Sequence, residues 1–338
     1  MVYEIHDPAN YILPDVILDF TNVKLKQIEK NRVFVSGAKG RPPTNTYKVS
    51  LTYQDGFIIS GSLMIGGINA EKKAKAVAYS ILTKVKNILT LFGLNDFDDT
   101  NVEVIGSETT YGPHSRALHS REVILRITVC HKNPKALGIF AKEMAPSATS
   151  MAPGISGSGG GRPKITPKIQ YSSVLCSKES IPITTSVGSN FNSTSIYEYL
   201  DETKFKSFSP ISNSSKFKIE GPTLKVPLIS LALGRSGDKG DNANIGIISR
   251  KPEYFDFLKE VLTSEIVYEY MKHVINGKII RYELPGIYGL NFVCSKSLGG
   301  GGLASLRVDR QGKCLAQMLL DIQIEIPFKL VDKLNSKL

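Results

Sequence analysis

A stretch rich in Ser, Thr and Asn, residues 177–222, divides the apolar sequence of this chain into two parts. Apolar residues are scattered through it, and a segment of this composition cannot bury enough apolar surface to offset the conformational entropy that folding costs. The chain has 338 residues, about twice the usual size of a single domain. We therefore predict two folded units, residues 1–176 and 226–330, joined by a linker over residues 177–225.

The first unit combines strand and helix patterns. Residues 16–65 alternate short β-branched runs with turn signals, which predicts an antiparallel meander whose last hairpin turns at Gln54-Asp55-Gly56. Residues 70–92 switch to a helical period and predict a long amphipathic helix that covers the sheet and ends at Gly93. Further strands are predicted at 102–106, 122–130 and 166–175, and a further helix at 134–144. We therefore expect an α+β unit with an antiparallel or mixed sheet and covering helices.

The second unit is predicted to be a ferredoxin-like α/β sandwich. Apolar runs at 226–233 and 244–249 predict two buried strands on either side of a Gly/Asp loop. Helical sequence begins at Pro252 and ends at Asn276-Gly277. Two more strands are predicted at 279–285 and 305–309, followed by a short helix, whereas residues 288–298 are ambiguous. Four strands with a few helices in a unit of this size are typical of the ferredoxin-like fold.

Composition narrows the classes of partner. Lys plus Arg number 42 against 31 Asp plus Glu, a net charge of +11 that favours an anionic partner. No apolar run approaches the length of about 20 residues that spans a bilayer, and no zinc-finger, helix-turn-helix or aromatic-basic pattern favours nucleic acid. The four cysteines lie far apart without C-x-x-C spacing or a nearby His pair, so neither a zinc site nor a disulfide framework is indicated. The N-terminal sequence has no targeting pattern, and we expect a cytoplasmic protein without membrane or nucleic-acid partners.

The strongest local signal is the sequence GRSGDKGDNANIG, residues 234–246, between two apolar runs. Glycines there permit an anion-binding nest of N–H groups, with Arg235 and Lys239 neutralising a phosphate or carboxylate. The two aspartates are compatible with positioning a metal or restraining those cations, and the whole segment is compatible with a tight β connection that caps its own backbone. The candidate ligand-binding residues are Arg235, Ser236, Asp238, Lys239, Asp241 and Asn244.

Two further Gly-rich turns place an arginine beside a proline, at Arg41-Pro42 and at Arg162-Pro163. A guanidinium stiffened in this way suits bidentate binding of a carboxylate or phosphate, and the alternative is that each arginine bridges loop carbonyls. The serines lack the G-x-S-x-G pattern of a hydrolase. We therefore add Arg41 and Arg162 as candidate ligands, and assign no catalytic residue, metal or cofactor.

Several longer motifs occur in a fixed order along the chain. They are DPANYILPDV at 7–16, VSGAKGRPPT at 35–44, ATSMAPG at 148–154, GGGRP at 159–163 and the loop at 235–246. In this order they resemble the AtuA family of acyclic terpene utilisation proteins. The resemblance implies that residues 1 to about 175 correspond to the latter half of the family's large N-terminal domain, and residues 226–328 to its ferredoxin-fold C-terminal domain.

The resemblance also implies a setting, the breakdown of branched acyl-CoA and acyclic terpenoids alongside biotin-dependent carboxylases and acyl-CoA dehydrogenases. It implies no settled reaction. We expect an anionic small molecule or acyl-CoA as ligand, and either a homo-oligomer or a partner chain that supplies the first portion of the family's N-terminal domain. Two functions stay open: an enzyme or enzyme subunit acting on such a metabolite, and a non-catalytic binding or scaffolding module, a truncated paralogue, for a partner enzyme of that pathway.

Overall fold

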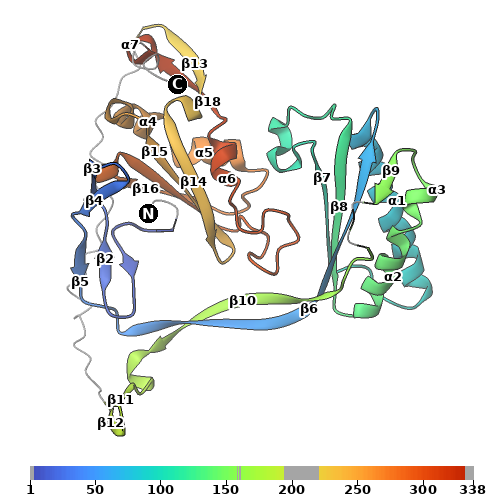
Figure 1. The fold of residues 1–338 in the computed structure, drawn as a ribbon, viewed down its shortest axis with the longest axis horizontal. Coiled ribbons are helices and arrows are strands. Elements are labelled where there is room, and N and C mark those ends of the chain that lie inside the picture. Colours follow the sequence, from blue (N-terminus) through green and yellow to red (C-terminus); the bar gives the residue numbers. More distant parts are fainter. Residues whose placement is uncertain (1–3, 158, 160, 194–220, 332–338) are drawn as a thin grey trace. The chain divides into compact units, whose positions relative to one another are not determined.

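The computed structural model describes residues 4–157, 159, 161–193 and 221–331 (Figure 1). The chain forms two compact units that each take segments from distant parts of the sequence. Unit 1 comprises residues 1–51, 172–297 and 311–338, and unit 2 comprises residues 52–171 and 298–310. These units cross the boundaries predicted from the sequence, because residues 1–51 fold with the C-terminal part of the chain and residues 298–310 fold with the middle of it. Of the predicted linker, residues 194–220 lie outside the described residues.

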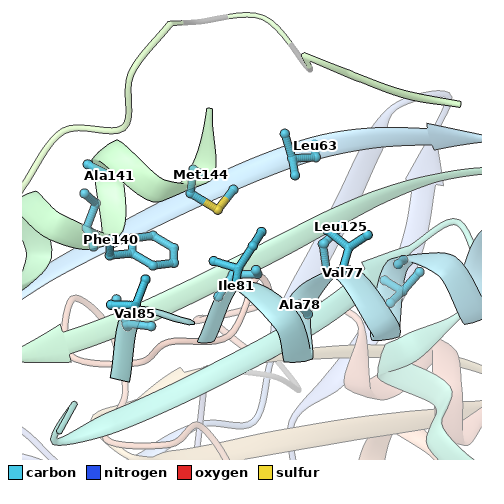
Figure 2. Packing of buried hydrophobic residues seen from close by; sticks show 14 of the residues in the cluster. Leu63, Val77, Ala78, Ile81, Val85, Leu125, Phe140, Ala141 and Met144 are labelled. Carbon is cyan, nitrogen blue, oxygen red and sulfur yellow. The ribbon is translucent and has the colours of Figure 1, made fainter. Parts of the chain in front are cut away.

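Unit 2 is an antiparallel sheet with helices packed against it. The strands are β6 (Thr46–Gly66), β7 (Asp99–Ile105), β8 (Glu122–His131), β9 (Ile155–Gly157) and β10 (Thr166–Ser177), and the helices are α1 (Ala70–Leu91), α2 (Pro134–Met144) and α3 (Ser147–Ser150). The sheet order is β10-β6-β8-β7, with β9 paired to β6. The ends of β6 and β10 continue into unit 1. Apolar side chains of α1 and α2 pack on β6 and β8 and form the core of this unit (Figure 2).

The two long helices of unit 2 follow directly from local sequence. Val77, Ile81 and Val85 recur at helical spacing and are buried, which places one face of α1 on the sheet. Gly93 adopts a φ of +67° immediately after the helix, the left-handed conformation that commonly ends a helix. Asn133 caps α2, since its side chain accepts a hydrogen bond from the N–H of Lys135 at 3.0 Å. Both predicted helices are confirmed.

The predicted hairpin at Gln54-Asp55-Gly56 is wrong, because these residues lie inside the continuous strand β6. From Phe57 onward β6 pairs with β8, and the register runs from Phe57 opposite His131 to Gly66 opposite Glu122. Gly56 has a φ of +79°, and a Cβ there would lie 3.1 Å from the carbonyl oxygen of His131. Pairing with a distant strand therefore replaces the local turn that the Asp-Gly pair favours.

The C-terminal half of unit 1 contains a four-stranded antiparallel sheet of order β14-β15-β17-β16. Its elements are β14 (Ala232–Lys239), β15 (Asn242–Ser249), α4 (Phe255–Val261), α5 (Ser264–Met271), β16 (Ile279–Leu284), β17 (Gly289–Cys294) and α6 (Leu315–Leu319). This is the strand order of the β-α-β-β-α-β sandwich in a circularly permuted form, in which the last strand of the sandwich comes first in the chain. The ferredoxin-like prediction and the α+β class are confirmed. Residues 305–309 are not the fourth strand, which is β17, from the ambiguous segment.

Small strands complete unit 1. They are β1 (Tyr11–Ile12), β2 (Ile17–Asp19), β3 (Lys24–Glu29), β4 (Arg32–Ser36), β5 (Lys39–Arg41), β11 (Thr184–Val187), β12 (Asn190–Ser193), β13 (Thr223–Pro227) and β18 (Gln323–Pro327), and α7 spans Phe328–Val331. The first strands pair as β1-β2-β5 and β3-β4, and β13 pairs with β18. Val23 is buried together with Leu284 and Ile287, so the N-terminal segment shares an apolar core with the ferredoxin-like part.

Candidate functional site

The predicted Gly/Asp loop is a β-hairpin. Residues 232–239 and 242–249 pair continuously, with Arg235 opposite Gly246 and Lys239 opposite Asn242. Only Gly240 and Asp241 form the turn, and Gly240 has a φ of +67°. Successive N–H groups of a strand point to opposite sides, so they do not converge on one anion. The nest conformation predicted for this segment is therefore wrong, and anion binding by its side chains stays a prediction.

Ser236 has a structural role in this hairpin. The side chain is 3% exposed, and its hydroxyl donates to the carbonyl oxygen of Gly312 at 2.5 Å and accepts the N–H of Ala316 at 2.9 Å. These contacts hold the segment that leads into α6. Arg235 is exposed, and Asp238 forms a long ion pair with Lys313, with 4.0 Å between Oδ1 and Nζ.

Lys239 contacts the N-terminal segment of the chain directly, and Asn244 is connected to it through Asn291. The ammonium group of Lys239 pairs with the carboxylate of Glu4. Asn244 is fully buried, and its Nδ2 donates to Oδ1 of Asn291 at 3.1 Å. Nδ2 of Asn291 in turn donates to the carbonyl oxygens of Ile5 and His6, at 2.6 Å each. Sequence reasoning missed Asn291, although an Asn inside the apolar run GLNFVC signals a buried polar contact.

Arg41 belongs to the same N-terminal segment. The Asp7 carboxylate accepts the N–H of Ala9 at 2.9 Å and Nδ2 of Asn10 at 2.7 Å, which closes the Asp-Pro-Ala-Asn motif on itself. A guanidinium nitrogen of Arg41 donates to the carbonyl oxygen of Ala9 at 2.6 Å and to Oδ1 of Asn10 at 2.8 Å. Arg41 therefore bridges oxygen atoms of the N-terminal loop, which is the alternative to ligand binding that the sequence left open.

This polar region of unit 1 disfavours added charge. Burial, followed by the positive charges of Lys239 and Lys48, lowers the pKa of His6 from its ordinary value. Burial, followed by the negative charge of Asp7, raises the pKa of Tyr282. The structure thus brings the candidates Arg41, Lys239 and Asn244 into one unit, around the N-terminal motif.

Arg162, the remaining candidate, borders a pocket of about 690 Å³ in unit 2. The floor consists of the buried side chains Leu63, Ala141 and Met144, which lie on one side of the core cluster (Figure 2). Arg162 and Lys164 line the pocket and are exposed to solvent. The rest of the described lining consists of Ser60, Ser62, Ala145, Ala148, Gly157, Gly159, Gly161 and Pro163.

This lining suits an anionic ligand with an apolar body. Two cations stand beside an apolar floor, and no ion pair engages Arg162 or Lys164 among the described residues. The described residues of the lining include no His, Cys, Asp or Glu, and the hydroxyl of Ser60 is hydrogen-bonded to that of Thr128 at 2.8 Å. The pocket therefore has the chemistry for binding, without a general base among its described residues.

Two properties concern the whole described chain. No three His, Cys, Asp or Glu side chains within it come together in a way that could hold a metal ion. None of its helices is both long and apolar enough to span a membrane.

Comparison with known families identifies both parts of the sequence. The family model of acyclic terpene utilisation family protein AtuA matches residues 1–187, and that of the AtuA ferredoxin-like domain matches residues 226–325. No curated protein and no solved structure matches the chain. The first match alone covers more than half of the chain, and the second includes all four strands of the sheet β14-β15-β17-β16. The chain belongs to the AtuA family of acyclic terpene utilisation proteins.

Proposed function

We propose that this protein binds an anionic acyl ligand, a CoA ester or free carboxylate formed in branched acyl-CoA and acyclic terpenoid breakdown, in the pocket of unit 2. The observation that carries the proposal is the buried apolar floor beside the cations Arg162 and Lys164. The cytoplasmic location expected from the sequence belongs to the same proposal.

The physical chemistry of such a ligand fits both parts of the pocket. A branched acyl chain gains about 0.8 kcal/mol for each CH₂ that it buries. The side chains of Leu63 and Met144 offer the apolar surface for this burial. A charge-assisted contact to a carboxylate or phosphate adds about 1.5 to 3 kcal/mol. The pocket volume of about 690 Å³ lies within the usual range for small-molecule sites.

One glycine supports the proposal that the pocket of unit 2 binds a ligand. Gly61 lies in β6 beneath the pocket, and a Cβ at this position would lie 2.8 Å from the terminal methyl of Met144 and 3.3 Å from Cγ of Pro163. A larger residue would displace these two side chains, which both line the pocket. Glycine at position 61 therefore lets the pocket lining keep its present arrangement.

The alternative function, a non-catalytic binding or scaffolding module for a partner enzyme, is favoured by a different observation. The described pocket lining has no acid–base pair that could carry out chemistry on a bound ester. A homo-oligomer or a partner chain that contributes to the site belongs to this second proposal. Incubating the protein with an acyl-CoA and following the mass of the ester distinguishes an enzyme from a binding module, because a module leaves the ester unchanged.

The binding proposal is tested by calorimetry with 3-methylbutanoyl-CoA, 3-methylbutanoate and free CoA. We expect Arg162→Gln to weaken binding of the acyl-CoA about ten- to a hundredfold, because one charge-assisted contact is lost. Arg121→Gln is the matched control, since Arg121 is an exposed arginine of unit 2 outside the pocket. Equal binding by the wild type and Arg162→Gln contradicts the proposal. Loss of binding in Arg235→Ala alone moves the site to β14.

A further inference from the structure

The hairpin formed by β3 and β4 in unit 1 (Figure 1) leaves its apolar side chains exposed. Val33, Phe34 and Val35, the central residues of β4, are 52%, 54% and 52% exposed. Leu25 of β3 lies opposite Val35 in the register and is 49% exposed. No residue of either strand is buried. Since a two-stranded hairpin alone is at best marginally stable in water, this hairpin has the surface of an incomplete sheet.

β4 is the open edge of this hairpin. The residue before β3, Val23, is buried with Ile287, and β3 itself lies against residues 285–287. In the part of the chain that the structure describes, β4 pairs with β3 and with no other strand. Edge strands of soluble proteins are normally blunted by a charged side chain, a proline or a covering element. β4 has its one charged residue, Arg32, at its first position, and three consecutive apolar residues follow, so this edge can accept a further strand.

The sequence of β4 is complementary to itself in the antiparallel direction. When two copies pair about a twofold axis at Phe34, this residue lies opposite its own counterpart, and Val33 lies opposite Val35 of the second copy. Arg32 then lies opposite Ser36 of the second copy, so that no like charges face each other. The charged residue and the small polar residue at the two ends of β4 therefore fit the same strand in the opposite direction.

Such pairing produces a four-stranded sheet in the order β3-β4-β4-β3, with two distinct faces. Alternate residues of a strand share a face, so Val33 and Val35 of both copies, together with Leu25, form a continuous apolar strip on one face. On the other face the two Phe34 side chains lie opposite each other, each beside Lys26, its neighbour in the register. Cross-strand pairs of apolar and aromatic side chains stabilise a sheet. The added strand also binds the backbone N–H and C=O groups on the outer side of β4.

We propose that β4 is a self-association surface, on which a second copy of this chain adds its own β4 in the antiparallel register centred on Phe34. The self-complementary order of charged, apolar and polar residues in this strand favours a second copy as the occupant. A single pair of strands buries less area than the interface of an obligate dimer, so the dimer forms and dissociates with protein concentration. The surface belongs to unit 1, and association on it does not depend on a ligand in the pocket of unit 2.

The test is sedimentation equilibrium of the full-length chain over a series of concentrations up to its solubility limit. We expect the mass of the wild type to rise from that of one chain to that of two. Phe34→Lys places two like charges opposite each other at the centre of the interface, and should keep the chain monomeric throughout the series. Phe92→Lys is the matched control, because Phe92 follows α1 in unit 2 and is 71% exposed. It should leave dimerisation unchanged.

A pair of opposite charges tests the register and excludes misfolding as the cause of a monomer. Phe34→Glu alone should also be monomeric, whereas an equimolar mixture of Phe34→Lys and Phe34→Glu should dimerise, because the register brings the two opposite charges together. Misfolded chains would not regain the dimer on mixing. A wild type that stays monomeric at every concentration overturns the proposal, and so does a Phe34→Lys chain that dimerises like the wild type. A mixture that stays monomeric overturns the register centred on Phe34.

Discussion

The hydroxyl of Ser236 shows how one buried polar group holds two distant segments together. It contacts the backbone of both Gly312 and Ala316, so its removal leaves a buried carbonyl and a buried N–H without this partner. Ser236→Ala should lower the free energy of unfolding by about 1 to 3 kcal/mol, as measured in urea. Ser80→Ala is the control, because Ser80 lies on the exposed face of α1 and its hydroxyl donates to the carbonyl oxygen of Ala76 in the same helix. A Ser236→Ala chain as stable as the control would contradict the structural role.

His6 predicts a dependence of stability on pH. Burial lowers its folded-state pKa below the ordinary value of 6.5, so the unfolded chain binds a proton more readily. The contribution of neutral His6 to the free energy of unfolding is fully present above pH 6.5. It is lost as the pH falls below this value towards the lower, folded-state pKa. We expect His6→Gln to flatten this part of the stability curve, measured by urea unfolding between about pH 5 and pH 8. His119→Gln, at an exposed position, should leave the curve unchanged.

The four free cysteines are expected to differ sharply in reactivity. Burial raises the pKa of the Cys294 thiol to about 12, and Cys130 is buried too, whereas Cys314 is exposed. Only the thiolate is a good nucleophile. Iodoacetamide at pH 8 should therefore modify Cys314 first in the native protein, and Cys130 and Cys294 only after unfolding. Peptide mass spectrometry over time reads out the order, and rapid modification of Cys294 in the native protein would contradict it.

Among whole elements, those with a strong local period were predictable and those made by distant pairing were not. The helix α1 carries its apolar face and its terminal Gly93 in the sequence itself. The Asp55-Gly56 pair favours a turn, yet strand β6 continues through it because β8 supplies the pairing. Likewise, nothing near Arg235 or Ser236 in the sequence distinguishes a loop from the two strands that form there. The sequence offered Arg41, Lys239 and Asn244 as candidates for ligand binding. It does not show the tertiary contacts that connect them to the N-terminal motif, which Lys239 and Arg41 make directly and Asn244 makes through Asn291.

Two glycines, Gly61 in β6 and Gly138 in α2, allow a test of the pocket with a matched control. Gly61→Ala in β6 places a methyl group 2.8 Å from the end of the flexible Met144 side chain, so this side chain, which lines the pocket, must shift. We expect a folded protein whose affinity for 3-methylbutanoyl-CoA falls severalfold in calorimetry. Gly138→Ala in α2 meets no atom within 4 Å, and it should leave the affinity unchanged while stabilising the helix by up to about 1 kcal/mol. Unchanged affinity in Gly61→Ala would argue against use of this pocket.

At the scale of the whole molecule, unit 1 is held together by contacts between the two ends of the chain. Asn291 binds the backbone at Ile5 and His6, and Val23 is buried with Leu284 and Ile287. A protease that cuts within the Ser- and Asn-rich sequence 177–222 would separate the N-terminal segment from the C-terminal part of unit 1. We expect the two fragments of a nicked protein to migrate together on a native gel and to separate in urea. Fragments that separate without denaturant would contradict this assembly of unit 1.

The interleaved order of segments has a consequence for synthesis on the ribosome. Asn291 must find a backbone carbonyl 285 residues earlier in the chain, and unit 2 is completed only by residues 298–310. Neither unit can therefore finish folding until residues 291–310 have been synthesised, long after the N-terminal segment has emerged. Contacts of such long sequence separation slow folding, because the loop between them must close first. We therefore expect nascent chains of this protein to be prone to aggregation until residues 291–310 have been synthesised.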